Sequence, residues 1–314
     1  MEYSKKNLTE LSNRSTFIKD NLEKVLRLID ILKYINNDDY LKGKLALKGG
    51  TAINLSLNNL PRLSVDIDLD YSMPIDKEEL PMEKEKIKGS ILHYANINGY
   101  TIKKESKEHY ALHSLILSYK NNSGNPDTIK IEINYMNRIH ILPLVNKMVI
   151  IENITEPFSV LMLNQIELYS SKLNALLSRA TPRDLYDVDI MIKRNVINDY
   201  DMLRKCFVFY KMISGESEVA FDITKIKNIN YMKVKMQLRP IMKKSDPFLL
   251  EEVKQNVISF LERLLIFEES ETLFMNKFND GIFEPNIIFD DDISKSLIDH
   301  PMAKWRISGI LKSK

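Results

Sequence analysis

Apolar side chains recur every three or four positions between residues 17 and 35, which predicts an amphipathic helix. Residues 78–98 repeat this pattern and predict a second helix. Later runs alternate as strands do, at residues 100–103, 113–119 and 128–135. The last two are separated by a segment rich in Asn, Gly and Pro, which predicts a turn. We therefore expect a mixed, largely antiparallel sheet with helices packed against it.

The pattern becomes helical from Pro157 onward. Residues 160–177 place their apolar side chains on one stripe, which predicts a helix. Thr181 then precedes Pro182, and a Thr N-cap with Pro at the first helical position predicts the start of another helix. Further helices are expected over residues 197–275.

The chain of 314 residues is long enough for two domains. We expect a domain with the sheet at residues 1–156 and a helical domain at 157–314, in an α/β (α+β) fold. An acidic tail is expected around residues 290–292.

One predicted strand carries two acids. Asp66 and Asp68 alternate with Val65, Ile67 and Leu69, although Asp is depleted from strands. The repeat of two residues directs both carboxylates to one face and the apolar side chains to the other. Two carboxylates so close repel each other unless a cation lies between them, and oxygen ligands of this kind suit Mg²⁺ holding substrate phosphates. The strand therefore predicts a metal site for phosphoryl chemistry.

A pair of glycines precedes this strand. Gly49 and Gly50 allow backbone N–H groups to approach a phosphate, and Thr51 adds a hydroxyl donor. A helix that begins here would direct its positive end at the same anion. A Gly-Gly pair alone is most often a turn, but its combination with the acid strand favours a phosphate site.

A third acid lies in a later strand. Glu132 shares a face with Lys130 and Asn134, and an acid on the wet face of a strand is commonplace. Beside the two-acid strand in the same sheet, Glu132 is better interpreted as a further metal ligand or as a base for an attacking hydroxyl.

The helical half adds three charged candidates: Lys172, Asp184 and Asp187. A Lys at the border of an apolar stripe is usually an exposed snorkelling residue. Asp184 can be half of a capping box with Thr181, and Asp187 can pair with Arg183 four residues before it. Capping does not explain why two acids three residues apart recur on one helix face.

Composition excludes few classes of protein. Lys and Arg number 45 against 43 Asp and Glu, so the net charge of +2 neither requires nor excludes a nucleic-acid partner. We expect a cytosolic protein, because the chain lacks a signal-peptide pattern and an apolar run of ~20 residues. We also expect a monomer. The single Cys206 excludes an internal disulfide. P-loop, Rossmann and G-x-S-x-G motifs are also absent.

Together these residues resemble the AbiEii/AbiGii toxin family of nucleotidyltransferases, which includes the mycobacterial Men toxins and belongs to the DNA polymerase β-like superfamily. The resemblance covers about residues 14 to 195 and includes four motif blocks in order: Lys48-Gly49-Gly50-Thr51, then Arg62-x-Ser64-x-Asp66-Ile67-Asp68-Leu69, then Ile131-Glu132-Ile133, then Lys172-Leu173-x-Ala175-Leu176 with Arg183-Asp184-Leu185-Tyr186-Asp187. Residues after about 195 resemble the family only in being helical.

The resemblance implies an N-terminal polymerase β-like nucleotidyltransferase domain and a C-terminal helical domain, with an NTP and Mg²⁺ (or Mn²⁺) between them. It implies a bacterial toxin of a toxin–antitoxin or phage-defence system that transfers nucleotides, in some relatives to the 3′ end of tRNA, and is encoded beside its antitoxin. It assigns NTP binding to Lys48, Gly49, Gly50, Thr51, Arg62, Ser64 and Lys172, metal binding to Asp66, Asp68 and Glu132, and catalysis to Asp66, Asp68, Lys172, Asp184 and Asp187.

Two other classes compete with an RNA-modifying toxin. A kanamycin-type enzyme that modifies a small molecule, or an enzyme that modifies a protein, would use the same core, and a cationic drug would require an acidic pocket. A non-catalytic binding module is the third class, which the intact acids and glycines disfavour. Residues 223–245 carry seven Lys or Arg and no acid, interleaved with Tyr and Met. This stretch is either a solvated helix face or an RNA contact.

Overall fold

The computed structural model describes residues 4–151, 154–214 and 221–313. The chain folds into two compact units. Unit 1 comprises residues 1–138, 144–163 and 239–246, and unit 2 comprises residues 139–143, 164–238 and 247–314. The expected boundary at residue 156 therefore lies inside a strand, and a short later segment returns to unit 1.

Unit 1 is built on one sheet, whose strands are β1 (Leu45–Lys48), β2 (Asp66–Tyr71), β3 (Thr101–Ile102), β4 (Lys107–Glu108), β5 (Leu112–Lys120), β6 (Pro126–Asn134), β7 (Val145–Ile151) and β8 (Thr155–Met162). The strand order is β3-β5-β6-β2-β1-β8-β7, and β4 pairs with β5. Among the strands that the structure describes, β2–β6 and β1–β8 pair in parallel and the other pairs are antiparallel. The expected mixed, largely antiparallel sheet is confirmed.

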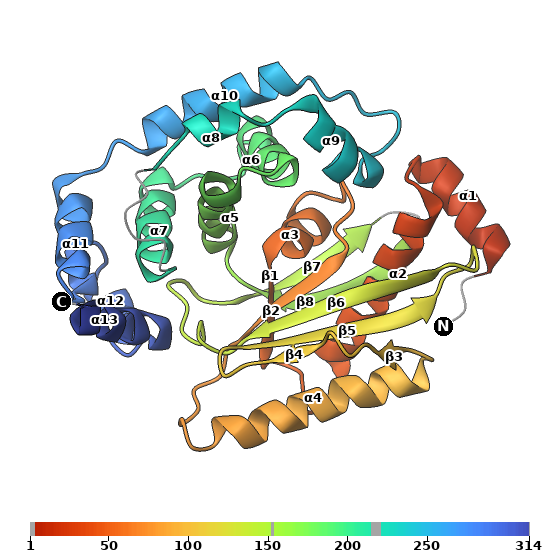
Figure 1. The fold of residues 1–314 in the computed structure, drawn as a ribbon, viewed down its shortest axis with the longest axis horizontal. Coiled ribbons are helices and arrows are strands. Elements are labelled where there is room, and N and C mark those ends of the chain that lie inside the picture. Colours follow the sequence, from red (N-terminus) through yellow and green to blue (C-terminus); the bar gives the residue numbers. More distant parts are fainter. Residues whose placement is uncertain (1–3, 152–153, 215–220, 314) are drawn as a thin grey trace. The chain divides into compact units, whose positions relative to one another are not determined.

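Apolar and polar positions divide this sheet between two faces. In β2, Ile67 and Leu69 are buried, whereas Asp66 and Asp68 point to the other face and are half-buried. Helix α2 (Lys19–Asn37) packs against β6, β8 and α4 (Leu80–Ile97) (Figure 1). Both helices match the predicted amphipathic segments to within two residues at each end.

A helical turn follows β1 directly. Helix α3 (Gly49–Thr51) continues as the π-helix η1 (Ala52–Leu57), and the chain then enters β2. Unit 1 is completed by α1 (Lys5–Ser15) and by residues 239–246, which include the 3₁₀ turn η2 (Arg239–Ile241). The Leu63 N–H donates to the Ile241 carbonyl at 2.7 Å, which ties this segment to the approach to β2.

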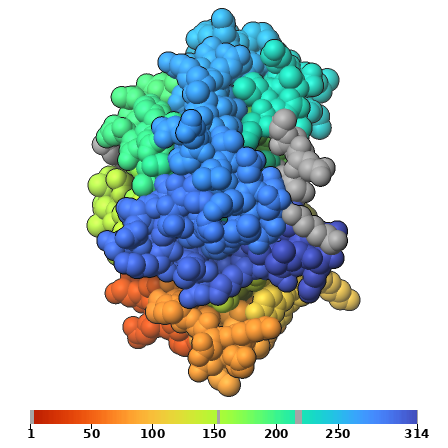
Figure 2. Space-filling model, turned by 90° about the vertical axis from the view of Figure 1, so that its left-hand side faces the viewer, coloured from red at the N-terminus to blue at the C-terminus, as the bar shows by residue number. Residues whose placement is uncertain are grey.

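Unit 2 is helical, with α5 (Gln165–Arg179), α6 (Pro182–Arg194), α7 (Tyr200–Ile213), α8 (Thr224–Lys227), α9 (Tyr231–Gln237), α10 (Leu250–Leu264), α11 (Glu269–Asn279), η3 (Pro285–Ile287), α12 (Asp291–Leu297) and α13 (Pro301–Ser313). Helix α5 packs against α6 and α7. In Figure 2 the blue atoms of α10 to α13 form one continuous surface of this unit. No helix in the described parts of the chain is long and apolar enough to cross a membrane.

Several expectations need correction. Residues 157–162 are not helical, because β8 runs to Met162 and α5 begins only at Gln165. The Asn164 side chain accepts a hydrogen bond from the Ile166 N–H and caps α5 there. The expected acidic tail is the start of α12, where Asp290 caps the Ile293 N–H and its acidic neighbours lie in the first turn, at the positive end of the helix dipole.

Candidate active site

Two neighbouring strands of unit 1, β2 and β6, bring acids side by side, and β1 adds a lysine next to them. The register pairs Asp68 with Lys48 of β1 and with Glu132 of β6, and it pairs Asp66 with Lys130. Residues paired in this way project from the same face of a sheet. The parallel pairing of β2 with β6 thus places Glu132 beside the two-acid strand.

The strand carries a third acid that the sequence interpretation missed. Asp70 is 1% exposed, and its Oδ1 lies 2.5 Å from Lys48 Nζ. Burial raises the pKa of Asp70, and the Lys48 ammonium opposes that rise. The alternation of Asp66, Asp68 and Asp70 at i, i+2 and i+4 was the available signal. In this structure the charge of Lys48, expected to contact the NTP, is paired with Asp70.

Glu132 forms an ion pair with a lysine of its own strand. Its Oε1 lies 2.9 Å from Lys130 Nζ, and both side chains are partly exposed. Among the residues that the structure describes, no three His, Cys, Asp or Glu side chains lie close enough to hold one metal ion. Glu132 would therefore have to move toward Asp66 and Asp68 to serve as a third ligand beside them.

Gly49 lies against the second acid of the strand. Its φ is +69°, a conformation that side chains rarely adopt, and a Cβ built there would lie 2.5 Å from Asp68 Oδ2. Glycine is needed here both for its backbone conformation and for its lack of a side chain. The turn and the acid strand are therefore one packed unit.

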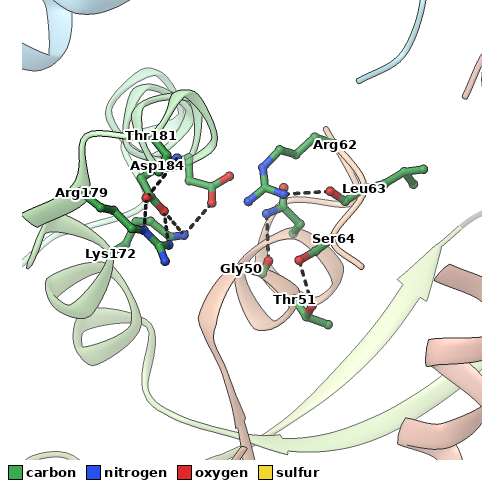
Figure 3. Close-up of polar contacts among 11 residues, drawn as sticks. Gly50, Thr51, Arg62, Leu63, Ser64, Lys172, Arg179, Thr181 and Asp184 are labelled. Atoms are coloured by element: carbon green, nitrogen blue, oxygen red, sulfur yellow. Dashed lines mark hydrogen bonds and ion pairs between the residues drawn. The ribbon is translucent and has the colours of Figure 1, made fainter. Parts of the chain in front are cut away.

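Hydrogen bonds hold the rest of the turn to the approach to β2 (Figure 3). The Thr51 hydroxyl lies 2.9 Å from Ser64 Oγ and also bonds to the Asp66 carbonyl. Arg62 is buried and donates from Nη1 to the Leu63 carbonyl at 2.8 Å. Thr51, Arg62 and Ser64 were expected to bind an NTP. In this structure their polar groups form hydrogen bonds between the turn and the segment leading into β2, and within that segment.

A second charged cluster lies in unit 2. Lys172 Nζ lies 2.9 Å from Asp184 Oδ1 and 3.0 Å from Asp187 Oδ2, and Lys172 is 6% exposed. The snorkelling interpretation of Lys172 is therefore wrong. The two acids recur three residues apart because both face Lys172 from α6, and Asp187 pairs with it rather than with Arg183.

Asp184 has further partners, which Figure 3 shows converging on its carboxylate. Arg179 Nε donates to Oδ2 at 2.7 Å, and the Thr181 hydroxyl donates to the same oxygen at 2.6 Å. Burial alone would raise the pKa of Asp184, but Lys172 and Arg179 hold it well below its usual range. The sequence interpretation missed Arg179, which ends α5.

The predicted cap at Thr181 is present, although the acid does not complete the expected capping box. Thr181 Oγ1 accepts from the Asp184 N–H at 3.3 Å. The Asp184 carboxylate binds the Thr181 hydroxyl instead of a backbone N–H at the N-cap. Its position is therefore set by charge as well as by the cap.

The basic stretch does not form one helix face. Lys225, Lys233 and Lys235 lie on α8 and α9 of unit 2, whereas residues 239–246 belong to unit 1. Lys225 Nζ contacts the Ser178 carbonyl at 3.3 Å, and Lys243 lies over the Phe17 ring. On α9, Lys233 and Lys235 are exposed.

Comparisons with known proteins identify this arrangement. The fold is similar to that of MenT4, a nucleotidyltransferase toxin from Mycobacterium tuberculosis H37Rv, with a TM-score of 0.59 and 14% identity over 92% of this chain and 93% of that one. No curated protein matches the sequence. The model of the nucleotidyl transferase AbiEii toxin family, a type IV toxin–antitoxin system, matches residues 30–280. The chain belongs to this family, so the expected family and fold class are confirmed.

The chain is thus a nucleotidyltransferase toxin of a toxin–antitoxin system, and membership of the family implies an NTP substrate and a cognate antitoxin. The match extends well beyond residue 195, to about which the resemblance in sequence motifs reached. The helical part after those blocks therefore belongs to the family as well.

Proposed function

We propose that this toxin transfers a nucleotide from an NTP to the 3′ end of a tRNA and so blocks translation and bacterial growth. The observation that carries the proposal is the pair Asp66 and Asp68 on one face of β2, with the Gly49 backbone against Asp68. A glycine turn packed on paired acids suits a polyphosphate held next to a cation.

The carboxylate oxygens of Asp66 and Asp68, on one face of β2, are ligands that suit Mg²⁺ or Mn²⁺. Asp66 and Asp68 would hold the metal, and Glu132 would join them only after its side chain moves toward them. When bound, the metal would supply positive charge that stabilises the transferring phosphoryl group and lowers the pKa of the attacking hydroxyl. The Gly49–Thr51 turn would receive the triphosphate at the positive end of its helix.

For Lys172 we propose a role in balancing the charge of the leaving pyrophosphate. An ammonium has three N–H donors, and Asp184 and Asp187 account for two of them. The third can donate to a phosphate oxygen without loss of either ion pair. The two aspartates, with Arg179 on Asp184, would fix the direction of that donor.

Exposed side chains on α9 favour RNA as the acceptor. Tyr231, Met232 and Met236 are at least 60% exposed, and Lys233 and Lys235 lie among them. Exposed cations with an aromatic neighbour suit a nucleic-acid backbone and an unstacked base. An acidic pocket for a cationic drug has no counterpart on this helix.

Incubation of the purified protein with each α-labelled NTP and total tRNA tests the proposal. Wild type is expected to label tRNA in a metal-dependent manner, and Asp66→Asn is expected to abolish labelling while the protein remains folded. Expression of wild type, but not of Asp66→Asn, is expected to arrest bacterial growth. In parallel reactions with a protein extract or an aminoglycoside in place of tRNA, labelling of these acceptors but not of tRNA would contradict the acceptor assignment.

A further inference from the structure

A cavity of about 420 Å³ lies in unit 1, and none of the residues that line it belongs to the acid strand β2. It is formed by the end of α1 and the two residues after it, by the turn after η1, by Ile151 at the end of β7, by Ile154 just before β8, and by Lys243, Ser245 and Asp246. Its volume is within the range of small-molecule sites. The mechanism proposed above uses none of its side chains.

The lining combines charge, hydroxyl groups and apolar surface. Arg14 and Lys243 contribute two cations, and neither forms an ion pair with a residue that the structure describes. Asp246 contributes one carboxylate. Ser15 Oγ is buried and has no hydrogen-bond partner among the described residues. Leu60 and other apolar side chains supply the rest of the wall. This lining suits an anion that also carries a ring and hydroxyl groups.

Backbone strain gathers at the same cavity. The described residues include five non-glycine positions with positive φ, and three of them line the cavity: Thr16 at 61°, Asn59 at 47° and Leu60 at 55°. A β-branched Thr in this conformation is a genuine outlier. Strain of this kind costs free energy and gathers where a ligand or a mechanism uses it.

The cavity is connected to the nucleotide-binding turn through one residue. The Leu60 N–H donates to the Asn54 carbonyl at 2.7 Å, and Asn54 Nδ2 donates to the Gly50 carbonyl at 2.8 Å. A ligand that fixes Leu60 therefore acts on the residue that holds the glycine turn.

We propose that this cavity is a second ligand site, which takes one nucleoside monophosphate unit. Its phosphate lies between Arg14 and Lys243, and its ring lies on the apolar wall at Leu60. Asp246 accepts a hydrogen bond from a ribose hydroxyl or a ring N–H and repels a second phosphate. Such a unit can be a free nucleotide or one nucleotide of an RNA strand.

Calorimetric titration of the full chain tests this site. The chain is first saturated with Mg²⁺ and a non-hydrolysable NTP analogue, which fills the acid site. Nucleoside monophosphates are then added, followed in separate runs by inorganic phosphate and by a single-stranded tetranucleotide. The test variant is Arg14→Gln/Lys243→Gln. The matched control is Lys244→Gln, which removes a neighbouring cation outside the cavity.

The proposal predicts binding of one monophosphate per chain in wild type and in Lys244→Gln. In the double variant this binding weakens about tenfold or more, because two charged contacts are lost. The double variant retains its affinity for the NTP analogue, which also shows that it is folded. If the tetranucleotide binds more tightly than the monophosphate, the natural ligand is one nucleotide of an RNA strand. If it binds more weakly, the natural ligand is a free nucleotide.

Three results would overturn the proposal. These are the absence of monophosphate binding to the NTP-saturated chain, equal affinity for inorganic phosphate, and unchanged affinity in the double variant. Because the readout is binding rather than transfer, failure of this site leaves the proposed transfer reaction untouched.

Discussion

Replacement of Gly49 by Ala combines two effects, backbone strain and displacement of the Asp68 carboxylate that we propose binds the metal. The substitution places a side chain at φ +69° and a Cβ 2.5 Å from Asp68 Oδ2. A left-handed conformation costs an Ala about 1–2 kcal/mol. The Asp68 carboxylate must also leave its position, at a further cost of about 0.5–1.5 kcal/mol in rotamer strain. We expect Gly49→Ala to lower the free energy of unfolding by about 1.5–3.5 kcal/mol.

The chain offers a matched control. Gly43 has a φ of +80°, and a Cβ there would meet nothing within 4 Å. Gly43→Ala should therefore lower the free energy of unfolding only through the strained backbone, by about 1–2 kcal/mol. Each folded molecule of this variant should transfer nucleotide at the wild-type rate.

The two variants should differ far more in activity than in stability. A reacting group misplaced by about 1 Å can cost roughly 100-fold in rate, so Gly49→Ala should lose at least that much activity. Urea unfolding gives the folded fraction, and transfer of labelled nucleotide at equal folded fraction gives the rate. The reasoning is refuted if Gly49→Ala transfers as fast as Gly43→Ala.

Three further predictions concern unit 2. Lys172→Met should lower the free energy of unfolding by about 3 kcal/mol, because two buried carboxylates lose a partner, whereas an exposed Lys would cost nothing measurable in urea unfolding. The pKa of Asp184 is lowered in the folded protein, so its contribution to stability is present above the ordinary carboxyl pKa and is lost as pH falls through the folded-state pKa. The difference in free energy of unfolding between wild type and Asp184→Asn, measured by urea unfolding, should therefore become smaller below about pH 4. A difference that stays constant with pH would contradict the lowered pKa of Asp184. Lys233→Gln/Lys235→Gln should make the slope of log K for tRNA binding against log salt concentration shallower by about 1.5, with NTP affinity unchanged. An unchanged slope would show that these lysines are solvated and do not contact RNA.

The sequence predicted the elements whose pattern is local. The helices at α2 and α4 and the strands β5 and β6 have clear periods of 3.6 or 2, and each is close to its predicted place. The acid strand was also found, because Asp between Val, Ile and Leu residues is unusual.

The missed elements lacked a local signal. Strand β1 is a short apolar run, Leu-Ala-Leu-Lys, that a buried helix could equally contain. The end of β8, Val160 to Met162, continues into α5 as one apolar stretch, and only the Asn164 cap marks the boundary.

Contacts between distant residues set the rest of the site. The pairing of Lys48 with Asp70 depends on the register of β1 with β2, and the role of Gly49 depends on its distance from Asp68. The burial of Lys172 depends on how α5 packs on α6, which no spacing within α5 reveals.

The attachment point of the nucleotide tests the central claim most directly. Total tRNA with an intact 3′ end and the same tRNA after periodate oxidation of its terminal ribose are each incubated with labelled NTP and Mg²⁺. Wild type should label only the intact tRNA, and Asp68→Asn, run alongside at equal folded fraction, should label neither. Equal labelling of both tRNA samples by wild type, or labelling of tRNA by Asp68→Asn, would contradict transfer to the 3′ hydroxyl at the acid strand.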